Sequence, residues 1–149
     1  MNDLKEYKIL IIDDEKMLLQ MYKTKFEKEG FQVAIEENGL DGLNRAVEMK
    51  PDIILLDMMM PGIDGMETLK GFRECTSLDV IIVIFSNLNQ DKSIDLQNIK
   101  EKGADACLIK ANHSPSQVAE KVKELILQKK QKGLKKVDNI LQLNVQQHV

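Results

Sequence analysis

The run Val80-Ile-Ile-Val-Ile-Phe85, six residues long, is the longest apolar stretch in the 149-residue chain. It falls far short of the roughly 20 residues that cross a bilayer. It is also too short for an ordinary helix, so it predicts a buried strand. Lys8-Ile-Leu-Ile-Ile12 and Ile53-Ile-Leu-Leu56 have the same character. Strands that are apolar on both faces are typical of a parallel sheet covered by helices on both sides.

Two more short runs, Phe31–Ile35 and Ala106–Ile109, bring the predicted strands to five, and a longer amphipathic stretch follows each strand. This alternation predicts an α/β fold of the doubly wound (βα)5 type, a three-layer sandwich around one parallel five-stranded sheet. Because right-handed crossovers bring the carboxyl ends of the strands to one edge, we expect the residues at those ends to share a crevice.

Helix boundaries are visible as well. Leu19, Tyr22 and Phe26 have helical spacing, and Gly30 follows them where a helix ends in left-handed backbone. The stretch Ser114-Pro-Ser-Gln117 is a capping box with proline at the first helical position, so we expect the last helix to begin there. The fifth strand and fifth helix are then complete by about Leu127.

The composition is that of a globular protein with one core, since 43% of the residues are hydrophobic and 30% are charged. We expect one domain over residues 1–128 and a Lys-rich C-terminal extension over residues 129–149. Residues 1–6 carry charges where a secretory signal has an apolar stretch, which predicts a cytoplasmic protein. Cys75 and Cys107 are too few and too far apart for a zinc site, so they are interpreted as packing residues.

The charge is unevenly distributed along the chain. Residues 1–127 hold 16 basic and 23 acidic side chains, a net charge of −7, whereas residues 128–149 hold 5 and 1, a net charge of +4. An acidic body with 4% aromatic residues lacks the basic stripe of a nucleic-acid binder, so no nucleic-acid partner is expected. The extension is expected to be helical or disordered, because Val137–Val149 has apolar residues at roughly helical spacing. Its lysines indicate a solvated helix end or, less simply, a contact surface for an anionic partner.

Polar residues follow four of the predicted strands: Asp13-Asp14-Glu15, Asp57, Ser86 and Lys110. Converging carboxylates repel one another, and a bound Mg²⁺ would offset that repulsion. An aspartate held between Mg²⁺ and a lysine stays ionised and can attack phosphorus, giving an acyl phosphate, while a nearby hydroxyl donates to a phosphoryl oxygen. Taken alone, the acidic triplet is more simply a helix N-terminus. The four strand ends taken together favour a phosphoryl-transfer site.

At these positions the chain resembles a bacterial response-regulator receiver domain of two-component signalling, of the stand-alone kind found among chemotaxis regulators. The resemblance covers about residues 7–127 and rests on four motifs in order. These are Ile11-Ile-Asp-Asp-Glu15, Leu55-Leu-Asp-Met-Met-Met-Pro-Gly-Ile-Asp-Gly65, Ile84-Phe-Ser86 and Gly103-Ala-Asp-Ala-Cys-Leu-Ile-Lys110. The family implies a flavodoxin-like sheet with strand order 2-1-3-4-5.

The resemblance also implies roles for single residues. Asp57 would accept a phosphoryl group from the phosphohistidine of a sensor histidine kinase or phosphotransfer protein. Asp14 would bind Mg²⁺ directly, Asp13 would bind it through water, and the backbone carbonyl of Met59 would complete the protein ligands. The output would be contact with an unknown downstream protein, and a phosphorylation-dependent homodimer is compatible with the family.

Ser86 takes the place of the family's switch hydroxyl and Lys110 that of its phosphate-binding lysine. Two positions depart from the family. Cys107 stands where many members have Tyr or Phe, which removes the aromatic rotamer switch. Ala111 stands where the family has a proline with a cis bond, and a cis bond to another residue costs about 2.5–4 kcal/mol. The loop after Lys110 is therefore expected to depart from the family's geometry, which would also move Lys110.

We weighed two competing functions. A phosphatase of haloacid dehalogenase type also uses an aspartate nucleophile with Mg²⁺, but it needs a second aspartate where this chain has Met59. The other is a receiver-like scaffold that does not respond to phosphorylation, which Cys107 and Ala111 favour. The preferred interpretation is a switch rather than an enzyme, with Mg²⁺-dependent self-phosphorylation and slow self-dephosphorylation only. The resemblance implies that Met59 and Leu88 border the path of an attacking water. Because neither side chain can hydrogen-bond a water, self-dephosphorylation is expected to be slow.

Overall fold

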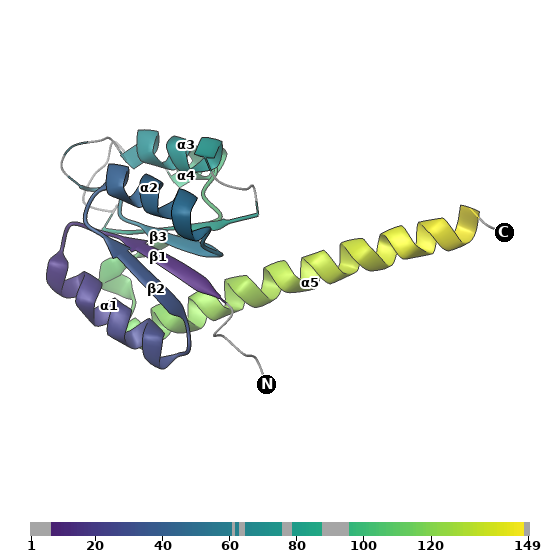
Figure 1. The fold of residues 1–149 in the computed structure, drawn as a ribbon, viewed down its shortest axis with the longest axis horizontal. Coiled ribbons are helices and arrows are strands. Elements are labelled where there is room, and N and C mark those ends of the chain that lie inside the picture. The colour runs from purple at the N-terminus through teal and green to yellow at the C-terminus, as the bar shows by residue number, and fades with distance from the viewer. Residues whose placement is uncertain (1–6, 61, 63–64, 76–78, 88–95, 148–149) are drawn as a thin grey trace.

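The computed structural model describes residues 7–60, 62, 65–75, 79–87 and 96–147, and Figure 1 shows their arrangement. The strands are β1 (Lys8–Ile12), β2 (Gln32–Glu36), β3 (Ile53–Leu56), β4 (Ile81–Ser86) and β5 (Ala106–Ile109). The helices are α1 (Lys16–Lys28), α2 (Gly39–Met49), α3 (Gly65–Cys75), α4 (Leu96–Glu101) and α5 (Pro115–Gln147), with a 3-10 turn η3 (Lys110–Asn112) between β5 and α5.

The five strands form one parallel sheet of order β2-β1-β3-β4-β5, which confirms the predicted fold class. The register aligns Ile12 of β1 with Leu56 of β3, and Leu56 with Ile84 of β4. The carboxyl ends of the central strands therefore lie side by side. The residues that come next in the chain, Asp13 and Asp57, are placed at one edge of the sheet by this alignment.

Each face of the sheet has its own hydrophobic core. Successive residues of β1 point alternately into the two cores. Ile9 and Ile11 pack with α1 and α5, whereas Leu10 and Ile12 pack on the side of α2, α3 and α4. The helices lie in these two layers in Figure 1. Burial of β1, β3 and β4 on both faces explains why their sequences lack the alternation of a half-exposed strand.

The helix ends follow local sequence. The capping box predicted at Ser114 is present: the Gln117 N–H donates to Ser114 Oγ over 3.2 Å, and the Ser114 N–H donates to Gln117 Oε1 over 2.8 Å. Gly30, which follows α1, has a φ of 103° in the left-handed region that glycine adopts without strain. Asn38 caps α2 by accepting the Asp41 N–H over 2.9 Å. These caps satisfy backbone groups that a helix leaves unpaired.

Two strands lie one residue later than predicted. The β2 strand runs over Gln32–Glu36, because Phe31 packs edge-on against Phe26, 5.4 Å between ring centroids, before pairing begins. The β4 strand runs over Ile81–Ser86, because Ser86 still pairs with Ile109 of β5. Ser86 is therefore the last residue of a strand and not the first residue of a loop.

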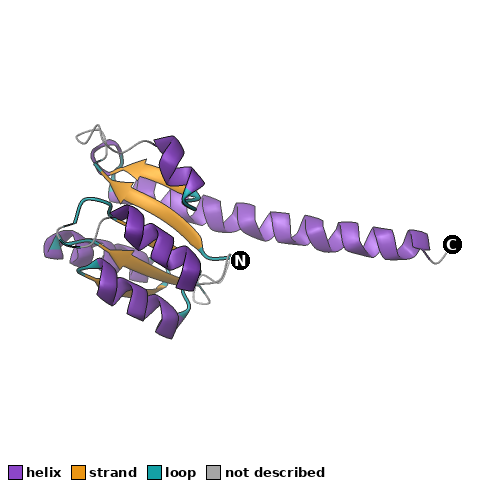
Figure 2. Ribbon diagram, turned by 90° about the horizontal axis from the view of Figure 1, so that it is seen from above, coloured by secondary structure: helices purple, strands orange, loops and turns teal. Residues whose placement is uncertain are grey.

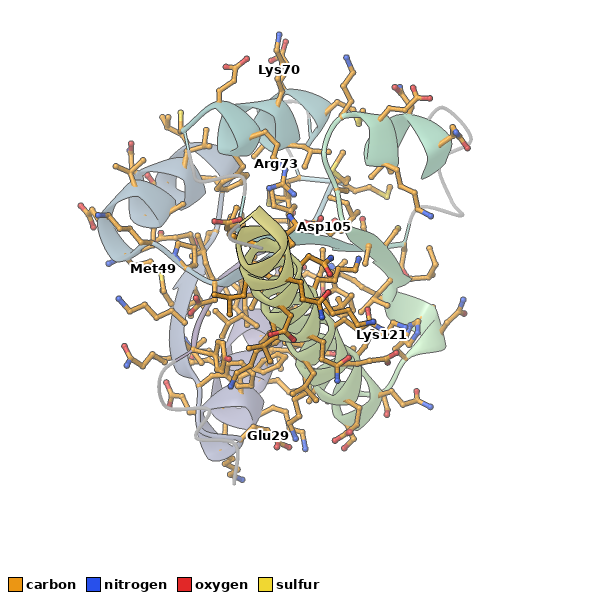
Figure 3. All side chains as sticks on the ribbon, turned by 90° about the vertical axis from the view of Figure 1, so that its right-hand side faces the viewer. Glu29, Met49, Lys70, Arg73, Asp105 and Lys121 are labelled. Carbon is orange, nitrogen blue, oxygen red and sulfur yellow. The ribbon has the colours of Figure 1, made fainter. Side chains whose placement is uncertain are left out.

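The edge of the sheet where the strands begin is stabilised by the side chain of Arg73. Arg73 of α3 donates to the carbonyl oxygens of Gly103 over 2.7 Å and Val80 over 2.9 Å, and to the carboxylate of Asp105 over 2.7 Å. Figure 3 labels Arg73 and Asp105 close together on this side of the molecule, which faces the viewer. This cluster joins α3 to the start of β5, on the side opposite the strand ends that carry the acidic residues.

The last helix is longer than the body that it covers. Helix α5 runs for 33 residues, and its first part packs against the sheet and α1 through Val118, Val122 and Ile126. Figures 1 and 2 show its remainder projecting away from the body. Leu134 and Leu141 on the projecting part are exposed. In the part of the chain that the structure describes, no helix combines the length and the apolar content needed to cross a membrane.

Candidate phosphoryl-acceptor site

Three polar side chains are buried at the carboxyl edge of the sheet: Asp13, Asp57 and Ser86, which are 1%, 4% and 0% exposed. The backbone fixes their places. The Asp57 N–H donates to the carbonyl of Ile12 over 3.0 Å, continuing the pairing between β3 and β1 past the ends of both strands. The Asp13 N–H donates to the carbonyl of Glu36 over 3.1 Å. Both carboxylates are therefore anchored by rigid strands.

Asp57 is the centre of the site. Its Oδ1 accepts the Ser86 hydroxyl over 2.5 Å and the Met59 N–H over 3.0 Å. Its Oδ2 pairs with Lys110 Nζ over 3.3 Å. Donors from β4, from the β3–α3 loop and from the end of β5 thus converge on one carboxylate. The predicted residues Asp57, Ser86 and Lys110 are brought together.

Lys110 also bridges the two buried carboxylates. Its Nζ lies 2.5 Å from Asp13 Oδ2 and 3.9 Å from Glu15 Oε1, and it stands 5.8 Å from the centroid of the Phe85 ring. Burial alone would lower the pKa of Lys110, but the hydrogen bond to Asp13 and the negative charge of Asp57 outweigh it, so this pKa is raised. Lys110 is therefore a fixed positive charge in the site.

The pKa of Asp13 is also raised, and in a carboxyl group a raised pKa favours the uncharged form. Burial raises its pKa, and the charge of Asp57 adds to this effect. The hydrogen bond from Lys110 and the Glu15 N–H, which donates to Asp13 Oδ1 over 3.0 Å, lower it only in part. Two carboxylates that share one lysine leave excess negative charge in a buried place. A second cation would remove that excess.

The carboxylates offer a place for such a cation. Ligand oxygens of Asp13, Asp14 and Asp57 all lie within 4.8 Å of one another, with Asp14 exposed at the rim. An octahedral Mg²⁺ with bonds of about 2.1 Å spans about 4.2 Å between opposite ligands, so three oxygens at this spacing fit one ion with little movement. That the backbone carbonyl of Met59 is a further Mg²⁺ ligand stays a prediction.

The acidic triplet could also be explained as the N-terminus of a helix, and helix α1, which follows it, argues against this explanation. Helix α1 begins at Lys16, Glu15 at its N-cap makes no side-chain capping bond, and the first turn holds no acidic residue. The Asp13 side chain instead bonds the Glu15 N–H and Lys110. Asp13 therefore belongs to the strand-end cluster and does not cap the helix.

Ala111 does not displace Lys110. No peptide bond among the described residues is cis, and Lys110–Asn112 form the 3-10 turn η3. The Ala111 N–H, which a proline would lack, donates to Asn87 Oδ1 over 3.0 Å. Asn87 follows Ser86 directly, so this bond ties the segment after the hydroxyl to the segment after the lysine. The sequence singled out Ala111 but gave no sign of its contact with Asn87.

The remaining predicted positions are placed as follows. Cys107 is half-buried beside the core formed by α2, α3 and α4, and burial raises the pKa of its thiol, as suits a packing residue. The same interpretation is wrong for Cys75, which is exposed at the end of α3. His113 is half-buried, with ring Nδ1 2.9 Å from the carbonyl oxygen of Ile109. Leu88, predicted to border the path of an attacking water, lies outside the described residues.

Comparisons with known proteins agree with this geometry. Residues 9–123 match the family described as response regulator receiver domain. A two-component response regulator from Clostridium difficile is 29% identical, with a TM-score of 0.72 over 81% of this chain and 96% of that chain. A response regulator receiver domain protein from Methanospirillum hungatei is 25% identical, with a TM-score of 0.71 over 85% and 98%.

A receiver domain of a Francisella response regulator is similar as well, at 29% identity and a TM-score of 0.69 over 80% of this chain and 96% of that chain. The family match spans most of the chain and includes every residue of the buried cluster. The chain belongs to the response regulator receiver domain family of two-component signalling.

Proposed function

We propose that Asp57 is the phosphoacceptor of this receiver and that the phosphohistidine of a histidine kinase or phosphotransfer protein is its donor. A carboxylate oxygen of Asp57 would form the bond to phosphorus as the bond from phosphorus to the imidazole nitrogen breaks, and that nitrogen keeps the electron pair. The observation that carries the proposal is the convergence of Ser86, Lys110 and the Met59 N–H on this one carboxylate.

The surrounding residues have separate tasks in this proposal. Asp13, Asp14 and Asp57 would hold Mg²⁺, which when bound neutralises charge on the phosphoryl oxygens. Lys110 supplies a positive charge that is already fixed within 3.3 Å of Asp57. Ser86 donates its hydroxyl proton to Asp57 Oδ1 before transfer and to a phosphoryl oxygen after it. Asp57 is the nucleophile in this proposal, and the other groups would stabilise the acyl phosphate that it forms.

A change in the hydrogen-bond partner of Ser86 would couple phosphorylation of Asp57 to a change in conformation. The hydroxyl is at the end of β4, and Asn87 beside it holds the backbone of Ala111. When the hydroxyl leaves Asp57 for a phosphoryl oxygen, Asn87 and the turn after Lys110 are expected to shift with it. Receiver domains interact with histidine kinases and with downstream effectors, and the changed face at β5 and α5 is the proposed contact for the effector.

We infer further that the phosphorylated state is long-lived and that the protein is not an enzyme with turnover. Met59 lies two residues after Asp57, is 41% exposed, and has no side-chain group that could orient a water. A phosphatase of haloacid dehalogenase type would need a carboxylate at this position. Met59→Asn is expected to accelerate loss of the phosphoryl group by up to about 100-fold, and decay in this variant no faster than in the wild type would contradict the inference.

The direct test is labelling with acetyl phosphate and Mg²⁺ followed by intact-mass measurement. The wild type is expected to gain one phosphoryl group and Asp57→Asn none. Asp52→Asn is the matched control, because Asp52 is a partly buried carboxylate that accepts the Lys8 N–H at the opposite edge of the sheet. Labelling of Asp57→Asn at the wild-type level would refute the assignment. Full labelling without any change in hydrogen exchange at β5 and α5 would favour the scaffold that ignores phosphate.

A further inference from the structure

The projecting part of α5 carries a symmetric stripe of side chains that the receiver function does not use. We define the stripe as Leu127, Lys130, Leu134, Asp138 and Leu141, all of which are exposed. At 100° per residue these five positions lie within an arc of about 80° on the helix. Their separations are three, four, four and three residues. The spacing of the stripe is therefore the same in both directions about Leu134, with leucine at both ends and with Lys130 and Asp138 at equivalent positions.

We propose that this stripe is an interface between two copies of the chain, paired antiparallel around a two-fold axis through Leu134. That axis sets Leu127 of each copy beside Leu141 of the other. It also sets Lys130 of each copy beside Asp138 of the other, so that two ion pairs flank a leucine centre. An interface of this kind uses the same surface patch on both copies, as two-fold dimers require.

Charge favours the antiparallel pairing over the parallel one. In a parallel pair Lys130 would face Lys130 and Asp138 would face Asp138, which repels twice. Antiparallel helices also place the two bodies, each with a net charge of −7 over residues 1–127, at opposite ends of the pair. Four lysines of the extension lie about 100° or more from the centre of the stripe and stay in solvent: Lys129, Lys132, Lys135 and Lys136.

The exposure of the leucines supports a helical partner. Leu134 and Leu141 are 61% and 56% exposed, on a stretch of α5 that runs on beyond the body. Helices without packing are marginal in water, and most of their stability comes from burial of one face. Leu127, Leu134 and Leu141 repeat every seven residues, the spacing of side chains in the seam between two paired helices. A membrane surface fits less well, because no aromatic residue follows Phe85 in the sequence.

The test is sedimentation equilibrium of the full chain over a range of concentrations. The wild type is expected at twice its mass of 17.0 kDa. Leu134→Glu sets two carboxylates against each other on the axis and is expected to weaken association at least tenfold. Asn139→Glu introduces the same residue on the far side of the helix and should leave association unchanged. Asp57→Asn should leave it unchanged too, because the interface does not depend on the phosphoacceptor.

Charge reversal tests the direction of the pairing. Lys130→Asp alone and Asp138→Lys alone each set like charges together twice, so each is expected to weaken association on the order of tenfold. The two changes combined restore opposite pairs and should restore the wild-type affinity. A wild type that stays monomeric up to about 1 mM would overturn the proposal. Failure of the combined variant to recover would overturn it too, as would binding of anionic phospholipid vesicles by a monomeric wild type.

Discussion

Replacement of Lys110 by methionine isolates the electrostatics of the buried site. At an effective dielectric constant of about 20, charges at the observed 2.5 Å and 3.3 Å attract by about 7 and about 5 kcal/mol. Desolvation of the three groups offsets most of this gross attraction. Removing one partner of a buried ion pair typically lowers the free energy of unfolding by about 3–5 kcal/mol, because a charge is left buried and unpaired. We expect Lys110→Met to fall in that range near neutral pH.

The loss should depend on pH in a defined direction. Asp13 already has a raised pKa, chiefly through burial, and loses the lowering effect of the lysine in the variant. A carboxyl whose pKa is higher in the folded than in the unfolded state binds its proton more tightly when folded. Its contribution is therefore present at low pH and lost as the pH rises through the folded pKa. The deficit of Lys110→Met is expected to be small in acid and to grow toward neutral pH.

Lys123→Met is the matched control. Lys123 also lies 2.5 Å from its carboxylate, that of Glu29, but both side chains are 25% exposed, whereas Lys110 and Asp13 are 10% and 2% exposed. Urea unfolding followed by circular dichroism should give a loss of about 1 kcal/mol or less for this pair. Equal losses in the two variants would refute the argument that burial sets the magnitude, as would a Lys110→Met deficit that does not change with pH. Mg²⁺ should recover more stability in Lys110→Met than in the wild type.

Three other changes are predicted from the same structure. Removal of residues 130–149 should leave cooperative unfolding and Asp57 labelling intact, and loss of cooperativity would show that the extension belongs to the core. Ala111→Pro removes the N–H that Asn87 accepts, so labelling by acetyl phosphate should slow several-fold; an unchanged rate would show that the bond does not position the site. The pKa of Glu29 is lowered by its hydrogen bond with Lys123. The deficit of Glu29→Gln should therefore be constant near neutral pH, shrink as the pH falls below the ordinary value of 4.5 and vanish below the lowered pKa of the folded state. Unfolding at several pH values measures this deficit, and one that persists in acid would argue against the ion pair.

The sheet was predictable because its central strands are buried on both faces. A run such as Ile53–Leu56 has few alternatives, since four consecutive apolar residues between polar ones cannot form half-exposed structure. The site followed from the same fact, because parallel strands place whatever follows them at one edge. The positions of Asp13, Asp57 and Lys110 in the chain were therefore enough to expect their meeting.

Other features depend on contacts that no local pattern encodes. The bond between Asn87 and Ala111 joins two loops 24 residues apart, and it depends on how the ends of β4 and β5 are aligned. That Lys110 lies nearer to Asp13 than to Asp57 depends on side-chain geometry at the sheet edge. The length of α5 was open as well, because its lysines are compatible with either a helix or a disordered tail.

The length of α5 gives the protein a lever arm. At a rise of 1.5 Å per residue, the stretch from Gln128 to Gln147 places the end of the helix about 30 Å beyond Leu127. A tilt of only about 5° at the body would then displace that end by about 2.6 Å. The ion pair of Lys123 with Glu29 lies near the fulcrum and holds α5 to the end of α1. Small rearrangements at the base of this helix are therefore magnified at its tip.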